Sequence, residues 1–215
     1  PDGTDMFVVY GALSPGNSFL HPREMDSKGP YNGQLASSLM SLSGTQEGGA
    51  LMLIDAANFS ENTVKANAQV AASNGQRQLT QQTINDGRGF SPFGRVTAPY
   101  PLWDGTNRIL MSYRPCEVTK NGVIVSCATL TPEEITRLGN RNRLASEAAA
   151  DAVQDNVPAS YAVYMYDPAQ QTQQIVAPPP QGFMYVDPVA IQSRPEPQVA
   201  QDTLVDPALA AQNLA

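Results

Sequence analysis

Short apolar runs alternate with Gly, Pro, Asn and Asp along most of this chain, and helical periodicity is nearly absent before residue 131. Short apolar runs bounded by turn residues are typical of β-strands. The pattern therefore predicts an all-β fold. The strands that it predicts are Met6–Leu13, Gln34–Leu42, Ala50–Ala56, Arg108–Tyr113, Glu117–Lys120, Val123–Ser126, Tyr161–Asp167, Gln173–Val176 and Pro188–Gln192.

Two runs between residues 131 and 157 are expected to be helical instead. Thr131 followed by Pro132 and Glu134 is the pattern of a capping box with proline at the first helical position. An Ala-rich run then spans residues 142–153 and stops before Pro158. Since predicted strands flank both runs, we expect a helical insertion at the surface.

The polar stretches divide the rest of the chain. Residues 57–98 have few apolar anchors and predict a long loop, and residues 14–33 predict another. Residues 1–193 are thus expected to form one β segment. Residues 194–215, rich in Pro, Ala and Gln, predict a tail or linker with a short helix at 207–214. Because the chain opens on Pro-Asp-Gly, we interpret it as part of a longer protein.

The two cysteines are expected to meet across a hairpin. Asn121-Gly122 between strand formers is the strongest short hairpin signal, and a two-residue turn there pairs Lys120 with Val123. Continuing that register places Cys116 opposite Cys127, at a separation that suits a disulfide. The disulfide indicates an oxidising compartment. The alternative is two buried free thiols; a zinc site would need further ligands.

An internal repeat supports tandem β units. The run Asp2–Tyr10 resembles Asp104–Tyr113, and Ala50–Asp55 resembles Ala162–Asp167 in the same order. Repeated β units of this kind point to a solenoid or a propeller. We expect Asp55, Asp104 and Asp167, at strand ends or turns, to cap turns through hydrogen bonds to the backbone.

Composition excludes some functions. The net charge is −7 and only 15% of the residues are charged, which argues against binding a phosphate backbone. No apolar run is long enough to span a membrane as a helix. With a single histidine, His21, and no Gly-x-Ser-x-Gly motif, a hydrolase triad has no support. We therefore expect no catalytic residues in this chain.

Two small groups are candidate sites. His21, Glu24 and Asp26 are metal-ligand types on a predicted loop, although a solvated loop with local ion pairs explains them as well. Trp103, the only tryptophan, lies near Tyr100. Exposed together, these rings would offer a platform for a sugar or a protein; packing between neighbouring β units is the alternative.

Several segments resemble one family. Pro1-Asp2-Gly3 before a β run, and the endings Ala50–Asp55 and Ala162–Asp167, resemble the repeat of TolB-like (PD40, WD40-like) β-propellers. Further segments resemble exported bacterial propellers related to the hydrazine synthase α subunit; these are residues 21–26, 91–95, 99–106, 164–167 and 184–190. The resemblance implies propeller-like blades and an exported, periplasmic or extracellular location.

The length of the chain allows only two or three such blades, so the ring would be completed elsewhere. The resemblance to hydrazine synthase would imply haem, but covalent c-type haem needs Cys-x-x-Cys-His, which is missing here. Haem is therefore expected only on segments outside this chain. Our main expectation is a scaffold that binds a protein partner, the remaining blades or a second copy. The alternatives are a part of a multihaem redox enzyme and a propeller that binds Ca²⁺ or carbohydrate.

Overall fold

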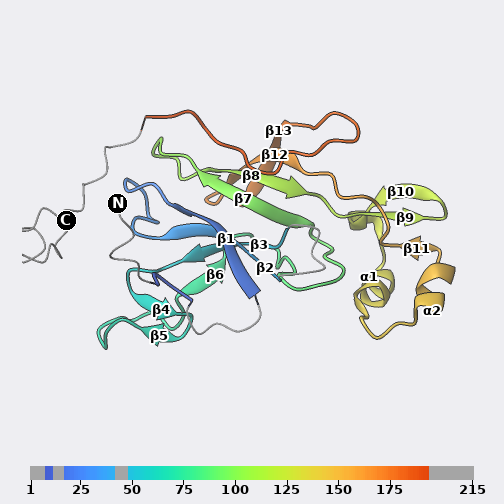
Figure 1. Cartoon of the computed structure of the whole chain (residues 1–215), viewed down its shortest axis with the longest axis horizontal. Coiled ribbons are helices and arrows are strands. Elements are labelled where there is room, and N and C mark those ends of the chain that lie inside the picture. The colour runs from blue at the N-terminus through green and yellow to red at the C-terminus, as the bar shows by residue number, and fades with distance from the viewer. Residues whose placement is uncertain (1–7, 12–16, 42–47, 194–215) are drawn as a thin grey trace, which may run out of the picture.

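The computed structural model describes residues 8–11, 17–41 and 48–193. They form a mostly β structure with two short helices (Figure 1). Two four-stranded antiparallel sheets make up its body, and a smaller three-stranded sheet lies at one end. The expected β fold with short helical insertions is confirmed at this level, while the described strands form no closed ring of blades.

Both four-stranded sheets are meanders whose strands lie side by side in chain order. The first meander consists of β1 (Asn17–Glu24), β2 (Leu35–Ser41), β3 (Ala50–Ile54) and β6 (Gln76–Gln78). The second consists of β7 (Arg95–Pro101), β8 (Ile109–Arg114), β12 (Ala162–Asp167) and β13 (Thr172–Ala177). A separate hairpin of β4 (Phe59–Glu61) and β5 (Val64–Lys65) lies between β3 and β6 in the chain.

The two meanders repeat one another residue by residue. Ala50 pairs with Leu39, which directly follows Ser38. In the same way, Ala162 pairs with Tyr113, which directly follows Ser112. Each of these serines lies opposite the residue before a bulge in the first strand of its meander. The predicted alignment of Ala50–Asp55 with Ala162–Asp167 is therefore confirmed. The other predicted pair matches β8 to Asp2–Tyr10, whereas the structural counterpart of β8 is β2.

Both bulges contain proline after a residue with positive φ. His21 has φ 52° before Pro22, and Ala98 has φ 46° before Pro99. In each strand, two residues oppose one on the partner strand. Proline has no N–H to give to a ladder, so a bulge is where a strand accepts it. The bulges let both strands continue through a Pro that would otherwise end them.

The main core lies where the meanders meet. β7 packs against β1, β2 and β3, and every residue of β3 is buried. Gly49 and Val96 exchange backbone hydrogen bonds of 2.8 and 2.9 Å, so the two sheets are also joined by the main chain. A side chain at Gly49 would collide with the backbone oxygen of Leu39, which explains a glycine at this contact.

Residues 115–157, which we call the insertion, lie between β8 and β12 and form the end seen at the right of Figure 1. They contain β9 (Glu117–Lys120), β10 (Val123–Ser126), a 3₁₀ turn (Cys127–Thr129), α1 (Pro132–Gly139), α2 (Ala145–Ala150) and β11 (Val153–Gln154). The insertion has its own small core around Val118, Cys127, Leu130 and Val153. It is thus a second packed unit attached to the second meander.

Several strand predictions need correction. β1 lies inside the predicted loop 14–33, and β4, β5, β6 and most of β7 lie inside the predicted loop 57–98. No strand forms at Pro188–Gln192 or at residues 8–11, the described part of Met6–Leu13. The predicted tail, 194–215, and its helix lie outside the described residues.

Candidate functional site

A groove of about 520 Å³ separates the second meander from the insertion. Its size falls within the range of small-molecule sites, about 300–1,000 Å³. It is lined by Thr80, Gln81, Gln82, Ile84, Pro92, Phe93, Tyr113, Pro115, Cys116, Ser126, Cys127, Ala128, Leu130, Ile135, Tyr166, Gln171 and Gln173. None of these residues is Asp, Glu, Lys, Arg or His. The groove therefore presents rings, aliphatic groups, amides and hydroxyls without any formal charge.

The insertion forms one wall of the groove, and a disulfide holds that wall together. Cys116 and Cys127 are bonded, with their Cα atoms 5.4 Å apart. The hairpin pairs Lys120 with Val123 and Glu117 with Ser126, as the Asn-Gly turn predicts. The predicted disulfide is confirmed, and it is consistent with an exported location.

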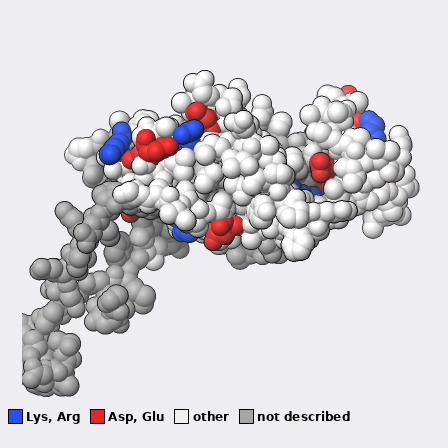
Figure 2. All heavy atoms as spheres, turned by 90° about the horizontal axis from the view of Figure 1, so that it is seen from above, with Lys and Arg blue, Asp and Glu red and all other residues white. Residues whose placement is uncertain are grey.

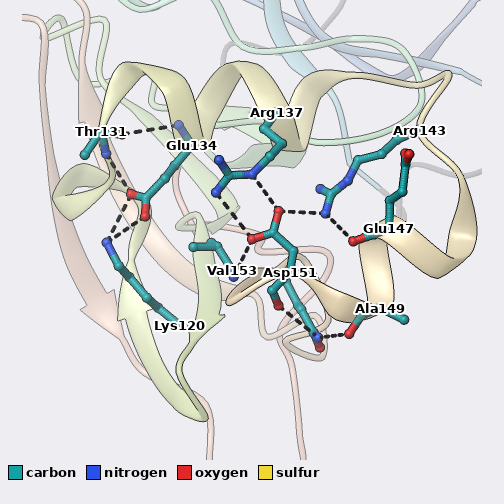
Figure 3. A network of polar contacts seen from close by, with 10 residues as sticks. Lys120, Thr131, Glu134, Arg137, Arg143, Glu147, Ala149, Asp151 and Val153 are labelled. Carbon is teal, nitrogen blue, oxygen red and sulfur yellow. Dashed lines mark hydrogen bonds and ion pairs between the residues drawn. The ribbon is translucent and has the colours of Figure 1, made fainter.

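Helix α1 packs on this hairpin and contributes Ile135 to the groove. The hydroxyl of Thr131 accepts a hydrogen bond from the Glu134 N–H, and the Glu134 carboxylate accepts one from the Thr131 N–H. The predicted capping box is thus confirmed. Lys120 of β9 reaches the same carboxylate at 2.9 Å and ties the helix to the hairpin (Figure 3).

A second set of polar contacts fastens α1 and α2 to β11. Asp151 lies between Arg137 and Arg143, each 2.6 Å from its Oδ2 atom (Figure 3). Its Oδ1 atom accepts a hydrogen bond from the Val153 N–H, which together with the two guanidinium groups lowers the pKa of Asp151. The helices are therefore held in place although neither buries a residue completely.

Two tyrosines form the opposite wall. The Tyr113 hydroxyl donates to the backbone oxygen of Phe93 at 3.1 Å. The Tyr166 hydroxyl lies 2.9 Å from the Leu79 oxygen and 3.0 Å from Oε1 of Gln171. Burial raises the pKa of Tyr113, and it is the main reason that the pKa of Tyr166 rises to about 12. Both hydroxyls therefore stay neutral at physiological pH.

Arg95 fixes the turn beside this wall. Its side chain is 5% exposed, and its guanidinium donates to four backbone oxygens, those of Gly48, Asn85, Gly87 and Gly89, at 2.6 to 3.2 Å. Burial lowers the pKa of Arg95. A lysine cannot replace this fork of donors. Sequence reasoning missed Arg95, because its acceptors are backbone oxygens between residues 48 and 89 that carry no local signal.

The predicted metal candidates hold structure together. Asp26 is buried and accepts hydrogen bonds from the Lys28 N–H at 2.9 Å and the Gly105 N–H at 2.7 Å. Glu24 is exposed, and His21 is the half-buried residue of the bulge in β1. Within the described ranges, no group of three or more His, Cys, Asp and Glu side chains is placed to hold a metal ion.

The predicted aromatic pair lies where the meanders meet. Trp103 is half-buried, and its indole N–H donates to the Glu24 oxygen of β1 at 3.3 Å. Tyr100 is half-buried in β7. The contact of Trp103 with β1 favours packing between neighbouring units over an open platform. The turn-capping role predicted for aspartates is confirmed at Asp104, whose Oδ1 atom accepts from the Thr106 N–H.

A second surface feature is an apolar strip, which we define as residues 172–191. It comprises β13 and the segment after it. Its exposed large apolar side chains are Ile175, Val176, Phe183, Met184, Tyr185, Val186, Val189 and Ile191. Asp187 is the only charged residue in this range. Figure 2 looks onto this side of the molecule and shows that most of it is free of Lys, Arg, Asp and Glu.

β13 is itself part of the second meander, and two further contacts hold the segment that follows it. The Tyr185 N–H donates to the Tyr161 oxygen at 2.9 Å. Just after the strip, the carboxamide of Gln192 accepts a hydrogen bond from the backbone N–H of Trp103 and donates one to the backbone oxygen of Pro101. Its apolar side chains are thus presented to solvent by a backbone that is anchored on the sheet.

In comparisons with known proteins, no family model, curated protein or solved structure matches the chain. None of the helices in the described ranges has the length and apolar character needed to cross a membrane.

Proposed function

We propose that this chain is a non-catalytic interaction module of an exported assembly, built from propeller-type blades, and that it binds another protein or further blades through the apolar strip. The observation that carries the proposal is the exposure of the strip. Folded monomers rarely leave large contiguous apolar patches in water, and such patches commonly mark protein–protein contacts.

The edge of β13 adds a second argument. β13 pairs only with β12, so its other edge is open among the described strands. Its sequence, Thr-Gln-Gln-Ile-Val-Ala, has no charge and no proline that would protect such an edge from pairing. A partner strand can therefore add here through backbone hydrogen bonds while the exposed Ile175 and Val176 are covered.

The two meanders support the blade interpretation. Each has four antiparallel strands in chain order, and each begins with a strand that bulges at an Xaa-Pro pair. Their first strands pack against one another. Two blades of a ring need neighbours, because an open row of sheets leaves faces and edges uncovered. A following unit packed on the outer strand of the second meander would cover the strip.

Cross-linking in the source organism, followed by mass spectrometry, identifies the partner, and the purified pair is then titrated. We expect Val176→Lys and Phe183→Ser to weaken the complex at least about tenfold, because both side chains would be buried in it. Val123→Lys is the matched control, since Val123 is equally exposed at the hairpin tip. Equal binding by all three variants, or a chain that cross-links to nothing, would refute the proposal.

A further inference from the structure

We propose that the groove between the second meander and the insertion binds a neutral oligosaccharide. The exposed apolar side chains of the strip lie outside this groove, although Gln173 of β13 lines it, and the inference goes beyond the interaction role proposed above. It starts from the position of the groove. The walls belong to two packed units with separate cores, which is a common location for ligand sites. Because a disulfide and a set of ion pairs hold the insertion together, its wall is preformed.

The chemistry of the lining selects an uncharged ligand. A charged ligand would leave water without gaining any opposite charge, since no ionised side chain lines the groove. Tyr113 and Tyr166 stay neutral because burial raises the pKa of both hydroxyls. An uncharged ligand that carries many hydroxyl groups avoids this cost.

Two neighbouring residues bring free amide groups to the groove. Gln81 and Gln82 are exposed, and no hydrogen bond ties their carboxamides to other described residues. Each carboxamide can donate and accept at the same time, which matches a sugar hydroxyl. Gln173 is bonded to the Tyr113 hydroxyl and keeps that ring in position.

An exposed aromatic ring lines the same groove. Phe93 is 42% exposed although the nearby Phe90 and Ser91 are buried, and its backbone oxygen accepts a hydrogen bond from the Tyr113 hydroxyl. The C–H face of a pyranose packs on such a ring, while the hydroxyls at its edge point toward polar side chains. Pro92 and Leu130 extend the apolar surface beside it. The groove thus offers apolar surface and amide groups together, which suits a sugar ring with its C–H face and its edge of hydroxyls.

An extended peptide fits the lining less well. Peptides that add to a sheet need a continuous row of backbone N–H and C=O groups. The groove is built from five short segments, residues 80–84, 92–93, 113–116, 126–135 and 166–173, and both edges of β8 are already paired. The polar groups of the groove are therefore side chains that lie apart from one another. Such groups suit hydrogen bonds to the hydroxyls of a sugar better than pairing with a peptide backbone.

The test titrates the full chain with neutral oligosaccharides that cover the common hexose and N-acetylhexosamine linkages. Saturation-transfer NMR and calorimetry measure the binding. We expect at least one to bind. Phe93→Ala should weaken that binding about tenfold, and Gln82→Ala should weaken it several-fold, because stacking and a hydrogen bond are lost. Phe183→Ala, which removes an exposed ring outside the groove, should leave it unchanged.

Three outcomes overturn the inference. They are no binding across the panel, binding that Phe93→Ala and Phe183→Ala affect equally, and preferential binding of an uncharged extended peptide. Circular dichroism and the intact mass of the oxidised chain establish that each variant is folded. Loss of partner binding in Val176→Lys with normal sugar binding would separate this site from the proposed interaction surface.

Discussion

The carboxylate of Asp26 accepts a hydrogen bond from the backbone N–H of Gly105 across 2.7 Å, and this contact joins a turn of the first meander to a turn of the second. Asp26 is 1% exposed, so water does not compete for the bond. Close by, the indole N–H of Trp103 donates to the backbone oxygen of Glu24. In both bonds the donor belongs to the second meander and the acceptor to the first. This end of the interface is therefore polar, while the rest of it is an apolar core.

Replacement of Asp26 by Ala should lower the free energy of unfolding by about 2–3 kcal/mol, because the backbone N–H groups of Lys28 and Gly105 lose a buried carboxylate acceptor. Asp104→Ala is the control, since Asp104 is exposed and bonds within its own turn. It should cost about 1 kcal/mol or less. Urea unfolding followed by fluorescence of Trp103 measures both. Equal losses would show that the bond between the meanders adds nothing.

Arg95→Lys should destabilise the chain nearly as much as Arg95→Met, by about 3 kcal/mol or more, because an ammonium group cannot reach four carbonyl oxygens at once. Arg88→Met is the matched control in the same turn, where the arginine is exposed. Thermal unfolding of the three variants gives the comparison. If the lysine variant were as stable as the wild type, the fork of four hydrogen bonds would not matter to the fold.

Removal of the disulfide by Cys116→Ser with Cys127→Ser should destabilise the insertion by about 3 kcal/mol, since the bridge closes a short loop. Hydrogen exchange should show faster opening of β9 and β10, while β2 and β3 keep their protection. The oxidised wild type should weigh two hydrogens less than the reduced chain. Equal loss of protection in β2 and β3 would mean that the insertion does not open as a separate unit.

Acid should loosen the insertion first. The pKa of Asp151 is lowered in the folded state, so its contribution to stability is present above the unfolded pKa of about 3.9 and is lost as the pH falls through the folded value. NMR amide signals of α1, α2 and β11 should therefore weaken below about pH 4 before those of the meanders. Asp151→Asn should lose this dependence and weaken the same signals at neutral pH. An unchanged acid profile in this variant would assign the effect to other carboxylates.

Local signals in the sequence predict the elements that depend on few residues. The Asn121-Gly122 turn fixes a register that brings two cysteines together, and Thr131 with Glu134 starts α1. Both features are decided within about a dozen neighbouring residues, where turn and capping preferences dominate. The apolar run of β3 is equally direct, because burial on both faces makes a strand read as a continuous apolar run.

The two long strands that escaped prediction both contain proline, while the other missed strands are only two or three residues long. β1 includes Pro22, and β7 includes Pro99 and Pro101. Sequence rules favour a loop at such residues, but positive φ at His21 and Ala98 turns each site into a bulge. Only the pairing with β2 and β8 stabilises that backbone, and this pairing is a property of the tertiary structure.

The groove could not be predicted from local patterns, because its five segments are distributed from residue 80 to residue 173. The predicted candidates Asp26 and Trp103 gather instead at the contact between the meanders. Their residue types suggested chemistry, whereas their burial and bonds serve the packing of one unit on the other. Residues with neutral amides, such as Gln82 and Gln173, gave no signal in the sequence.

The chain enters and leaves the insertion at neighbouring points, since the Arg114 side chain donates to the Val157 oxygen at 3.0 Å. The strands on either side, β8 and β12, pair directly with one another. A short turn between them would leave that register intact. The meanders can therefore accommodate deletion, lengthening or exchange of the insertion. Descendants of one ancestral gene can accordingly diverge in what they bind while they retain the same body.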